Sequence, residues 1–116
     1  MLPKQYRLKK RSAFKATYKV KNSSHSGGVT LFAGLKKKED YPTKVGFVVS
    51  KKVHKRAVRR NRLKRLMRES YRLLLKENNL GNSQNYISLI FVGTDKVLGK
   101  DFKHIKSSIE KLVGRI

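Results

Sequence analysis

Cysteine is absent from this chain of 116 residues, and its absence excludes two classes of small protein. Without cysteine, the chain is neither a disulfide-stapled scaffold nor a carrier of a cysteine-based zinc site. It must be stabilised by a packed core, and its length fits one domain with no room for a second independent core. A cysteine-free sequence is also consistent with a reducing compartment, and we expect a cytoplasmic protein.

Long apolar runs are missing as well. No stretch approaches the roughly 20 apolar residues that a membrane-spanning helix needs. The first residues, MLPKQYRLKK, lack the apolar segment of a secretory signal. We therefore expect neither a membrane partner nor secretion.

Acidic residues are scarce: 7 Asp and Glu stand against 30 Lys and Arg. The carboxylates are scattered along the chain, whereas a two-metal nuclease needs several of them converging on its ions. His25, His54 and His104 are isolated, without metal-ligand spacing, and we interpret them as surface residues. No Ser/His/Asp arrangement or glycine-rich phosphate loop is present. The sequence therefore predicts no catalytic residue and no metal ligand in this chain.

What the chain has in excess is positive charge, with a formal net charge of +23. Self-repulsion at this level disfavours a compact state unless a polyanion supplies counter-charge. Phosphate backbones are the commonest such partner, and counterion release drives their binding. A membrane surface is the alternative, but the basic residues are spread along the chain rather than confined to one anchor segment. A nucleic acid is the expected partner.

Hydrophobic periodicity predicts one α+β domain, an α/β sandwich around one small sheet. Helices are expected at about residues 13–20, 57–76 and 101–114, and strands at 29–35, 44–50 and 86–93. The first two strands are expected to pair as an antiparallel hairpin. The predicted order is helix, hairpin, long basic helix, central strand and C-terminal helix.

Local signals refine this outline. Residues 1–11 are basic, and we expect a flexible N-terminus. The segment NSSHSGG, residues 22–28, is typical of a loop. Ser12 and Asp101 are the candidate N-caps of the first and last helices.

The predicted helix at 57–76 has two opposed faces at 100° per residue. The apolar face carries Leu63, Leu66, Met67, Ser70, Tyr71 and Leu74. The opposite face carries Asn61, Lys64, Arg65, Arg68 and Arg72, with Arg60 and Arg62 on its flanks.

A solvated polar face is the ordinary interpretation of a charge run. Such faces interleave Glu with Lys or Arg at i,i+4, because like charges at that spacing destabilise a helix. Here only Glu69, four residues after Arg65, offers such compensation. Arginine outnumbers lysine, which favours bidentate phosphate contacts. The pattern therefore indicates a helix that faces RNA or DNA, and a helix-turn-helix pattern for DNA is missing.

This stretch also resembles the Arg-Asn-Arg signature of the bacterial ribonuclease P protein subunit. The matching positions are Ala57, Arg60-Asn61-Arg62, the aliphatic Leu63, Lys64-Arg65 and Arg68. Upstream, Ser50-Lys51-Lys52-Val53 is similar to the family's strand-end segment. Arg7-Leu8-Lys9, followed by Phe14 and Tyr18, is similar to its N-terminal helix. The resemblance covers nearly the whole chain, in the family's order.

The resemblance implies a specific partner. That partner is a catalytic RNA, which holds the catalytic Mg²⁺ and cleaves precursor tRNA, with one protein per RNA and no cofactor on the protein. It also implies a left-handed β-α-β crossover. Matched position by position, the catalytic-RNA contacts would be Arg60, Asn61, Arg62, Lys64, Arg65 and Arg68. The contacts with the 5′ leader of precursor tRNA would be Phe14, Tyr18, Phe32, Ser50 and Lys51.

The chain departs from the family pattern at two places. The segment at residues 54–56 is one residue longer than the common form. The glycine that often follows the first helix is replaced around Lys21-Asn22, where Asn22 tolerates a left-handed cap.

Two alternatives stay open. Phe14 and Tyr18 could simply pin the short helix to the sheet, although Phe32, beside the small Thr30 and Gly34, favours a surface on which bases stack. A ribosomal protein or RNA chaperone would share this composition, and only the Arg-Asn-Arg order and the aromatic groove favour ribonuclease P.

Overall fold

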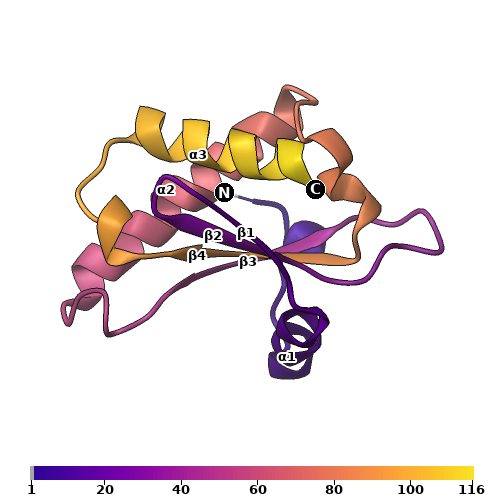
Figure 1. Cartoon of the computed structure of the whole chain (residues 1–116), viewed down its shortest axis with the longest axis horizontal. Helices are drawn as coiled ribbons and strands as arrows, with labels where there is room; N and C mark the ends of the chain where they lie inside the picture. The colour runs from indigo at the N-terminus through magenta and orange to yellow at the C-terminus, as the bar shows by residue number, and fades with distance from the viewer. Residues whose placement is uncertain (1) are drawn as a thin grey trace.

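One mixed sheet of four strands separates α1 from the other two helices (Figure 1). The computed structural model describes residues 2–116. The α-helices are α1 (Arg11–Val20), α2 (Ala57–Lys76) and α3 (Phe102–Arg115). The strands are β1 (Asn22–Ser26), β2 (Val29–Ala33), β3 (Lys44–Val49) and β4 (Ser88–Gly93), in the spatial order β1-β2-β4-β3. The predicted α+β class is confirmed.

The pairing of the strands differs from the predicted hairpin. The strands predicted at 29–35 and 44–50 do not pair with each other, because β4 lies between them. β4 is antiparallel to β2 and parallel to β3, so β3, α2 and β4 form a β-α-β unit. The central position suits β4, since its side chains are buried on both faces.

The hairpin of this sheet is formed by β1 and β2 instead. The segment predicted as a loop, residues 22–28, contains β1, whose backbone pairs with β2 from Asn22↔Ala33 to Ser26↔Val29. Gly27 and Gly28 make the turn with φ of 57° and 91°, which glycine adopts without steric cost. The serines of β1 gave no strand signal because an edge strand needs only backbone pairing on one side.

The core lies between the sheet and the pair α2 and α3, which cover the same face (Figure 1). The predicted apolar face of α2 is confirmed: Leu63, Met67, Ser70, Tyr71 and Leu74 are buried, and Leu66 is half-buried. The Tyr71 hydroxyl accepts a hydrogen bond from Nε2 of Gln84 at 2.9 Å. Burial raises the pKa of Tyr71 to about 12. None of the helices between residues 2 and 116 has both the length and the apolar composition for crossing a bilayer.

The N-terminal segment, for which the charge predicted flexibility, packs against β3. A short 3₁₀ turn spans Lys4–Tyr6, and Leu2 and Leu8 are buried. The Leu8 amide donates to the Val45 carbonyl at 2.9 Å, and Arg7 forms a parallel bridge with Val45. The apolar residues Leu2 and Leu8 cover the edge of the core, while the lysines between and after them face solvent. Met1 lies outside the described residues.

The helix caps confirm one prediction and correct another. The Asp101 carboxylate accepts from the His104 amide at 2.9 Å, as expected of the N-cap of α3. Ser12 is not a cap, because α1 starts at Arg11, two residues before the predicted start, and its N-cap is Lys10, without a side-chain hydrogen bond. The left-handed residue that ends α1 is Lys21, with φ of 61°, rather than Asn22.

Replacing Met67 by alanine tests the packing of α2. Met67 is fully buried, so Met67→Ala should lower the free energy of unfolding by about 2–5 kcal/mol in a urea titration. Val58→Ala is the matched control on the same helix: Val58 is 78% exposed, and its truncation should change stability by less than about 0.5 kcal/mol. Similar destabilisation in both variants would contradict the buried face of α2.

Candidate RNA interface

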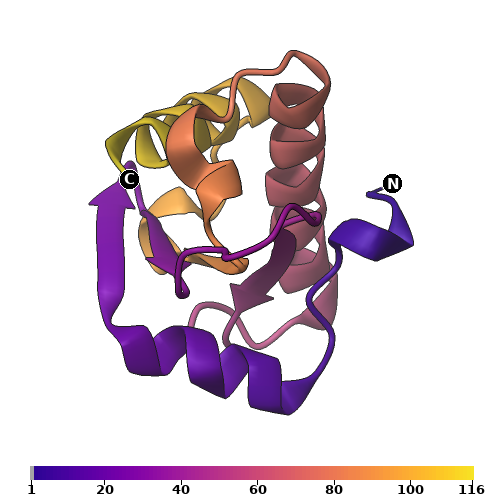
Figure 2. The ribbon, with the colours of Figure 1, turned by 90° about the vertical axis from the view of Figure 1, so that its right-hand side faces the viewer.

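α1 crosses the outer face of the sheet, on the side opposite to α2 and α3 (Figure 1). Figure 2 shows it passing beneath the strands, from the N-terminal segment to the start of β1. Three side chains mark its path over successive strands. Phe14 lies on Gly46 of β3, Thr17 bonds Ser88 of β4, and Tyr18 contacts Phe32 of β2. The helix therefore runs across the strands rather than along them.

Two of the predicted leader contacts, Tyr18 and Phe32, form an aromatic pair. Their ring centroids are 4.9 Å apart, with the planes at 78°, an edge-to-face contact. Tyr18 is 36% exposed and Phe32 is half-buried. Partial burial raises the pKa of Tyr18 above its ordinary value. The pair is thus both a packing contact and an accessible aromatic surface.

Phe14 is more strongly structural than Tyr18. Its ring is half-buried against β3, and a Cβ at Gly46 would lie 2.6 Å from the ring atom Cζ. Only glycine at position 46 lets the ring lie so close to the strand. Phe14 therefore packs α1 against the sheet, and the same ring also lines a hollow at the sheet edge.

Ser50 and Lys51 lie apart from the aromatic residues. They follow β3 at its C-terminal end, four and five residues beyond Gly46, which corresponds to roughly 13 Å or more along an extended strand. Both are exposed, and the Ser50 hydroxyl accepts from the Lys52 amide at 3.1 Å in a turn. The five predicted leader residues therefore form a strip rather than a cluster: Phe14, Tyr18 and Phe32 along α1, and Ser50 and Lys51 at the far end of β3.

The turn after β3 leads into a basic loop that sequence reasoning did not assign. A hollow of about 640 Å³ is lined there by Lys51, Lys52, Val53, His54, Lys55, Arg56 and Arg59. It contains no carboxylate, and the first turn of α2 has no acidic residue and no side-chain cap. The positive end of the helix dipole adds to the charge of these side chains. The charge run at 51–56 was the available sequence signal.

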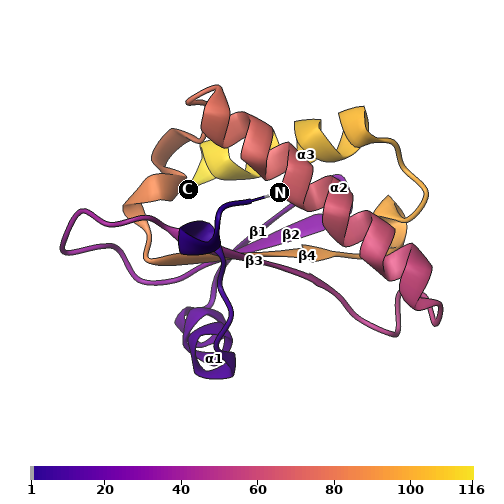
Figure 3. The same ribbon diagram turned by 180° about the vertical axis from the view of Figure 1, so that it is seen from behind.

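The predicted basic face of α2 divides into two rows. Asn61, Arg62 and Arg65 are exposed to solvent. Arg60, Lys64 and Arg68 are half-buried and follow one another at four-residue spacing, which places them on one side of the helix. Arg68 lines a hollow together with Val45 and Phe47 of β3, so this row borders the edge of the sheet. Figure 3 shows α2 from this side.

Glu69, the carboxylate expected to compensate the charge of Arg65, pairs with a different arginine. Glu69 pairs with Arg72, at 3.0 Å between Nη2 and Oε2, and the hydrogen bond from Arg72 lowers the pKa of the Glu69 carboxyl. Among residues 2–116, no carboxylate pairs with Arg62 or Arg65. Their charges are therefore available to a partner.

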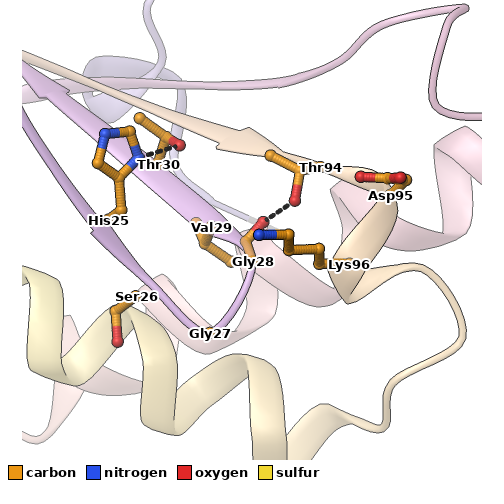
Figure 4. A pocket seen from close by; sticks show the side chains of 9 residues that line it. All are labelled: His25, Ser26, Gly27, Gly28, Val29, Thr30, Thr94, Asp95 and Lys96. Carbon is orange, nitrogen blue, oxygen red and sulfur yellow. Dashed lines mark hydrogen bonds between the residues drawn. The ribbon is translucent and has the colours of Figure 1, made fainter.

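The hollow at the β1–β2 turn contains a single carboxylate (Figure 4). Its volume is about 420 Å³, and its lining includes His25, Thr30, Thr94, Asp95 and Lys96. His25 Nδ1 lies 2.8 Å from the Thr30 hydroxyl, and Thr94 donates to the Gly28 carbonyl at 2.6 Å. Across residues 2–116, no three His, Asp or Glu side chains converge as metal ligands. The hollow thus has polar walls and one carboxylate, Asp95.

Comparison with known proteins identifies the family. The model of the Ribonuclease P family matches residues 2–116. The chain is 40% identical over 110 residues to the ribonuclease P protein component of Clostridioides difficile, covering 93% of this chain and 89% of that protein. It is 34% identical over 108 residues to that of Clostridium kluyveri, covering 93% and 91%.

Solved structures agree with the sequence match. The RNase P protein of Thermotoga maritima, in complex with 1-(4-fluorophenyl)-2-thiourea, superposes with a TM-score of 0.77 at 25% identity, covering 95% of this chain and 99% of that one. The Staphylococcus aureus RNase P protein gives a TM-score of 0.76 at 25% identity, covering 95% and 94%. The chain therefore belongs to the ribonuclease P protein family, as the protein component of an endoribonuclease that processes the 5′ ends of tRNA.

Proposed function

We propose that this protein component binds two RNAs at two surfaces on opposite sides of its sheet. The exposed row of α2 and its flanks bind the catalytic RNA, through Arg60, Asn61, Arg62, Lys64 and Arg65, with Arg68 at the border. The strip along α1 and β3 binds the 5′ leader of precursor tRNA, through Phe14, Tyr18, Phe32, Ser50 and Lys51. One protein would serve one RNA.

The observation that carries this proposal is the position of the Tyr18–Phe32 pair. The rings touch each other, yet Tyr18 stays 36% exposed on the face opposite to α2. An aromatic surface beside lysines and arginines is suited to an unpaired strand, because bases stack on rings and cations attract phosphates. A basic helix alone would suit any RNA, whereas two separated surfaces suit a protein that joins two RNAs.

The physical contribution of the protein would be electrostatic. A folded catalytic RNA and a precursor tRNA repel each other through their phosphates. A protein with a net charge of +23 between them reduces that repulsion and releases condensed counterions from both.

The chemistry would be supplied by the RNA subunit together with Mg²⁺ bound there. The protein's own seven carboxylates are scattered, and several of them already have structural roles. Asp101 caps α3, Glu77 pairs with Lys106 and Glu110 accepts from Asn79. The protein would therefore position substrate and neutralise charge.

Reconstitution tests the function as a whole. Added to a bacterial ribonuclease P RNA at low Mg²⁺, the protein should restore cleavage of precursor tRNA at the mature 5′ end. The protein alone, freed of RNA by nuclease treatment and repurified, should show no cleavage. If RNA-free protein cleaves, the non-catalytic role is wrong. If the protein binds RNA without restoring cleavage, a ribosomal or RNA-chaperone function is favoured.

The α2 surface is tested by salt dependence. Arg62→Ala combined with Arg65→Ala should reduce the slope of log affinity for the catalytic RNA against log salt by roughly 2, about 1 for each phosphate that the variant no longer neutralises. The matched control is Lys103→Ala with Lys111→Ala, which removes the same charge from exposed positions of α3. Equal reductions in both double variants would show that total charge, rather than the α2 surface, determines binding.

The leader surface is tested with a pair of tyrosines of similar exposure. Tyr18→Ala should weaken binding of precursor tRNA to the reconstituted enzyme by roughly 5- to 150-fold, the effect of removing the ring on which one base stacks, and leave mature tRNA binding unchanged. Tyr41 is 39% exposed in the loop before β3, where its ring lies under Lys37 rather than in the Tyr18–Phe32 pair, so Tyr41→Ala is the control. Equal weakening for precursor and mature tRNA in Tyr18→Ala would remove the leader assignment.

A further inference from the structure

The outer edge of β3 carries two adjoining hollows, and the proposed function uses only two of their lining residues, Phe14 and Arg68. The smaller, of about 180 Å³, lies between the N-terminal segment, the Phe14 ring, β3 and Arg68 of α2. The larger, of about 550 Å³, lies between the N-terminal segment and the start of α1. Both are lined by Arg7, Leu8 and Lys9, so they adjoin along this segment, and we treat the pair as one depression. We refer to it as the β3-edge depression.

The charge of this depression is uniformly positive. Its lining includes Lys4, Arg7, Lys9, Lys10, Lys44 and Arg68, and it includes no Asp or Glu. The ion pairs formed within residues 2–116, Arg72 with Glu69 and Lys106 with Glu77, use none of these six. Six uncompensated cations around a concave surface favour an anionic occupant.

The depression is held in place by backbone contacts. The Leu8 amide donates to the Val45 carbonyl at 2.9 Å, and Arg7 Nε donates to the Leu2 carbonyl at 2.8 Å. Leu2 and Leu8 are buried, which anchors the segment on both sides of Arg7. Leu8 is buried and Lys9 is exposed, while the half-buried Arg7 is held at the lining by its bond to the Leu2 carbonyl. A site organised in this way loses little conformational entropy when it binds.

The position of the depression connects the two proposed RNA surfaces. α1 crosses β3, β4 and β2 in turn, so an RNA strand lying beside it reaches the β3 edge at Phe14. Phe14 lines the smaller hollow, and Arg68 enters the same hollow from α2 on the other face of the sheet. Figure 3 shows the N-terminal segment running between α2 and α1 at this edge. A strand leaving the groove there meets the depression directly.

We propose that the β3-edge depression binds the phosphate backbone of the precursor-tRNA leader where that strand passes out of the groove along α1. Arg7, Lys9 and Arg68 hold one phosphate beside Phe14, and Lys4, Lys10 and Lys44 follow the strand outward. Arg68 then belongs to the leader surface, although its place in the Arg-Asn-Arg helix suggested the catalytic RNA. This inference rests on the proposed leader groove and extends it beyond the aromatic pair.

The test uses the reconstituted enzyme with Lys9→Gln and Arg68→Gln, which leaves the Arg7 bond to Leu2 intact. Affinity for precursor tRNA should fall roughly tenfold or more, because two charged groups no longer bind phosphate, while affinity for mature tRNA stays unchanged. The slope of log affinity for precursor tRNA against log salt should fall by up to about 0.7, the value for the one single-strand phosphate that these side chains hold. Urea titration of the free protein checks that the variant is folded.

A second variant and a control make the result specific. Lys4→Gln, Lys10→Gln and Lys44→Gln remove three exposed lysines of the larger hollow, and they should also weaken precursor tRNA binding selectively. Lys100→Gln, Lys103→Gln and Lys111→Gln remove the same charge at exposed positions at and before α3, and should not change the ratio of precursor to mature affinity.

Three outcomes would overturn the proposal: equal weakening for precursor and mature tRNA, weaker assembly with the catalytic RNA alone, or no change. Tyr18→Ala, measured in parallel, separates the two proposals. If Tyr18→Ala is selective and the depression variants are not, the leader groove holds and the extension is wrong. If Tyr18→Ala is not selective either, the leader groove itself is wrong.

Discussion

Mutual repulsion among thirty cationic side chains opposes folding, and the rest of this structure must overcome it. The apolar face of the sheet, covered by α2 and α3, provides the opposing free energy through burial of Leu63, Met67 and Tyr71 with their neighbours. Three of the seven carboxylates serve where these two helices meet or begin: Glu77 pairs with Lys106, Glu110 accepts from Asn79, and Asp101 caps α3. These acids stabilise the helical layer, whereas the hollows beside the N-terminal segment and the loop before α2 are lined by cations without a carboxylate.

Local patterns predicted the helices well and the strand pairing poorly. The bounds of α2 and the Asp101 cap follow from spacing and side-chain chemistry within a few residues, so they can be read from the sequence. The position of β4 between β2 and β3 depends on pairing between residues some 40 to 60 positions apart in the sequence. A local sequence pattern therefore cannot predict it. The strand β1 could not be predicted because its polar side chains have no strand preference. Its position is set by pairing with β2 and by the turn at Gly27-Gly28.

The same distinction applies to the candidate site. The exposed row Asn61, Arg62 and Arg65 could be predicted because helical periodicity alone places it outward. The different environment of Arg68 could not, since it depends on how the N-terminal segment packs beside β3. Likewise, Phe14 was predicted to be near the groove, but its close packing on Gly46 depends on the angle at which α1 crosses the sheet. The exposure of side chains along one helix can be predicted from sequence, whereas contacts between elements far apart in the chain cannot.

The place of β4 in the sheet also has a consequence for how the protein is made. β4 joins β2 to β3, yet it is the last strand in the chain, and a parallel partner separated by a helix contributes contacts of long sequence separation. Until residues 88–93 have left the ribosome, α1 lacks the three-strand platform that it crosses, and β3 lacks its neighbour. The proposed leader surface would therefore form late in synthesis, and a nascent chain exposes its basic segments before they are arranged for specific binding.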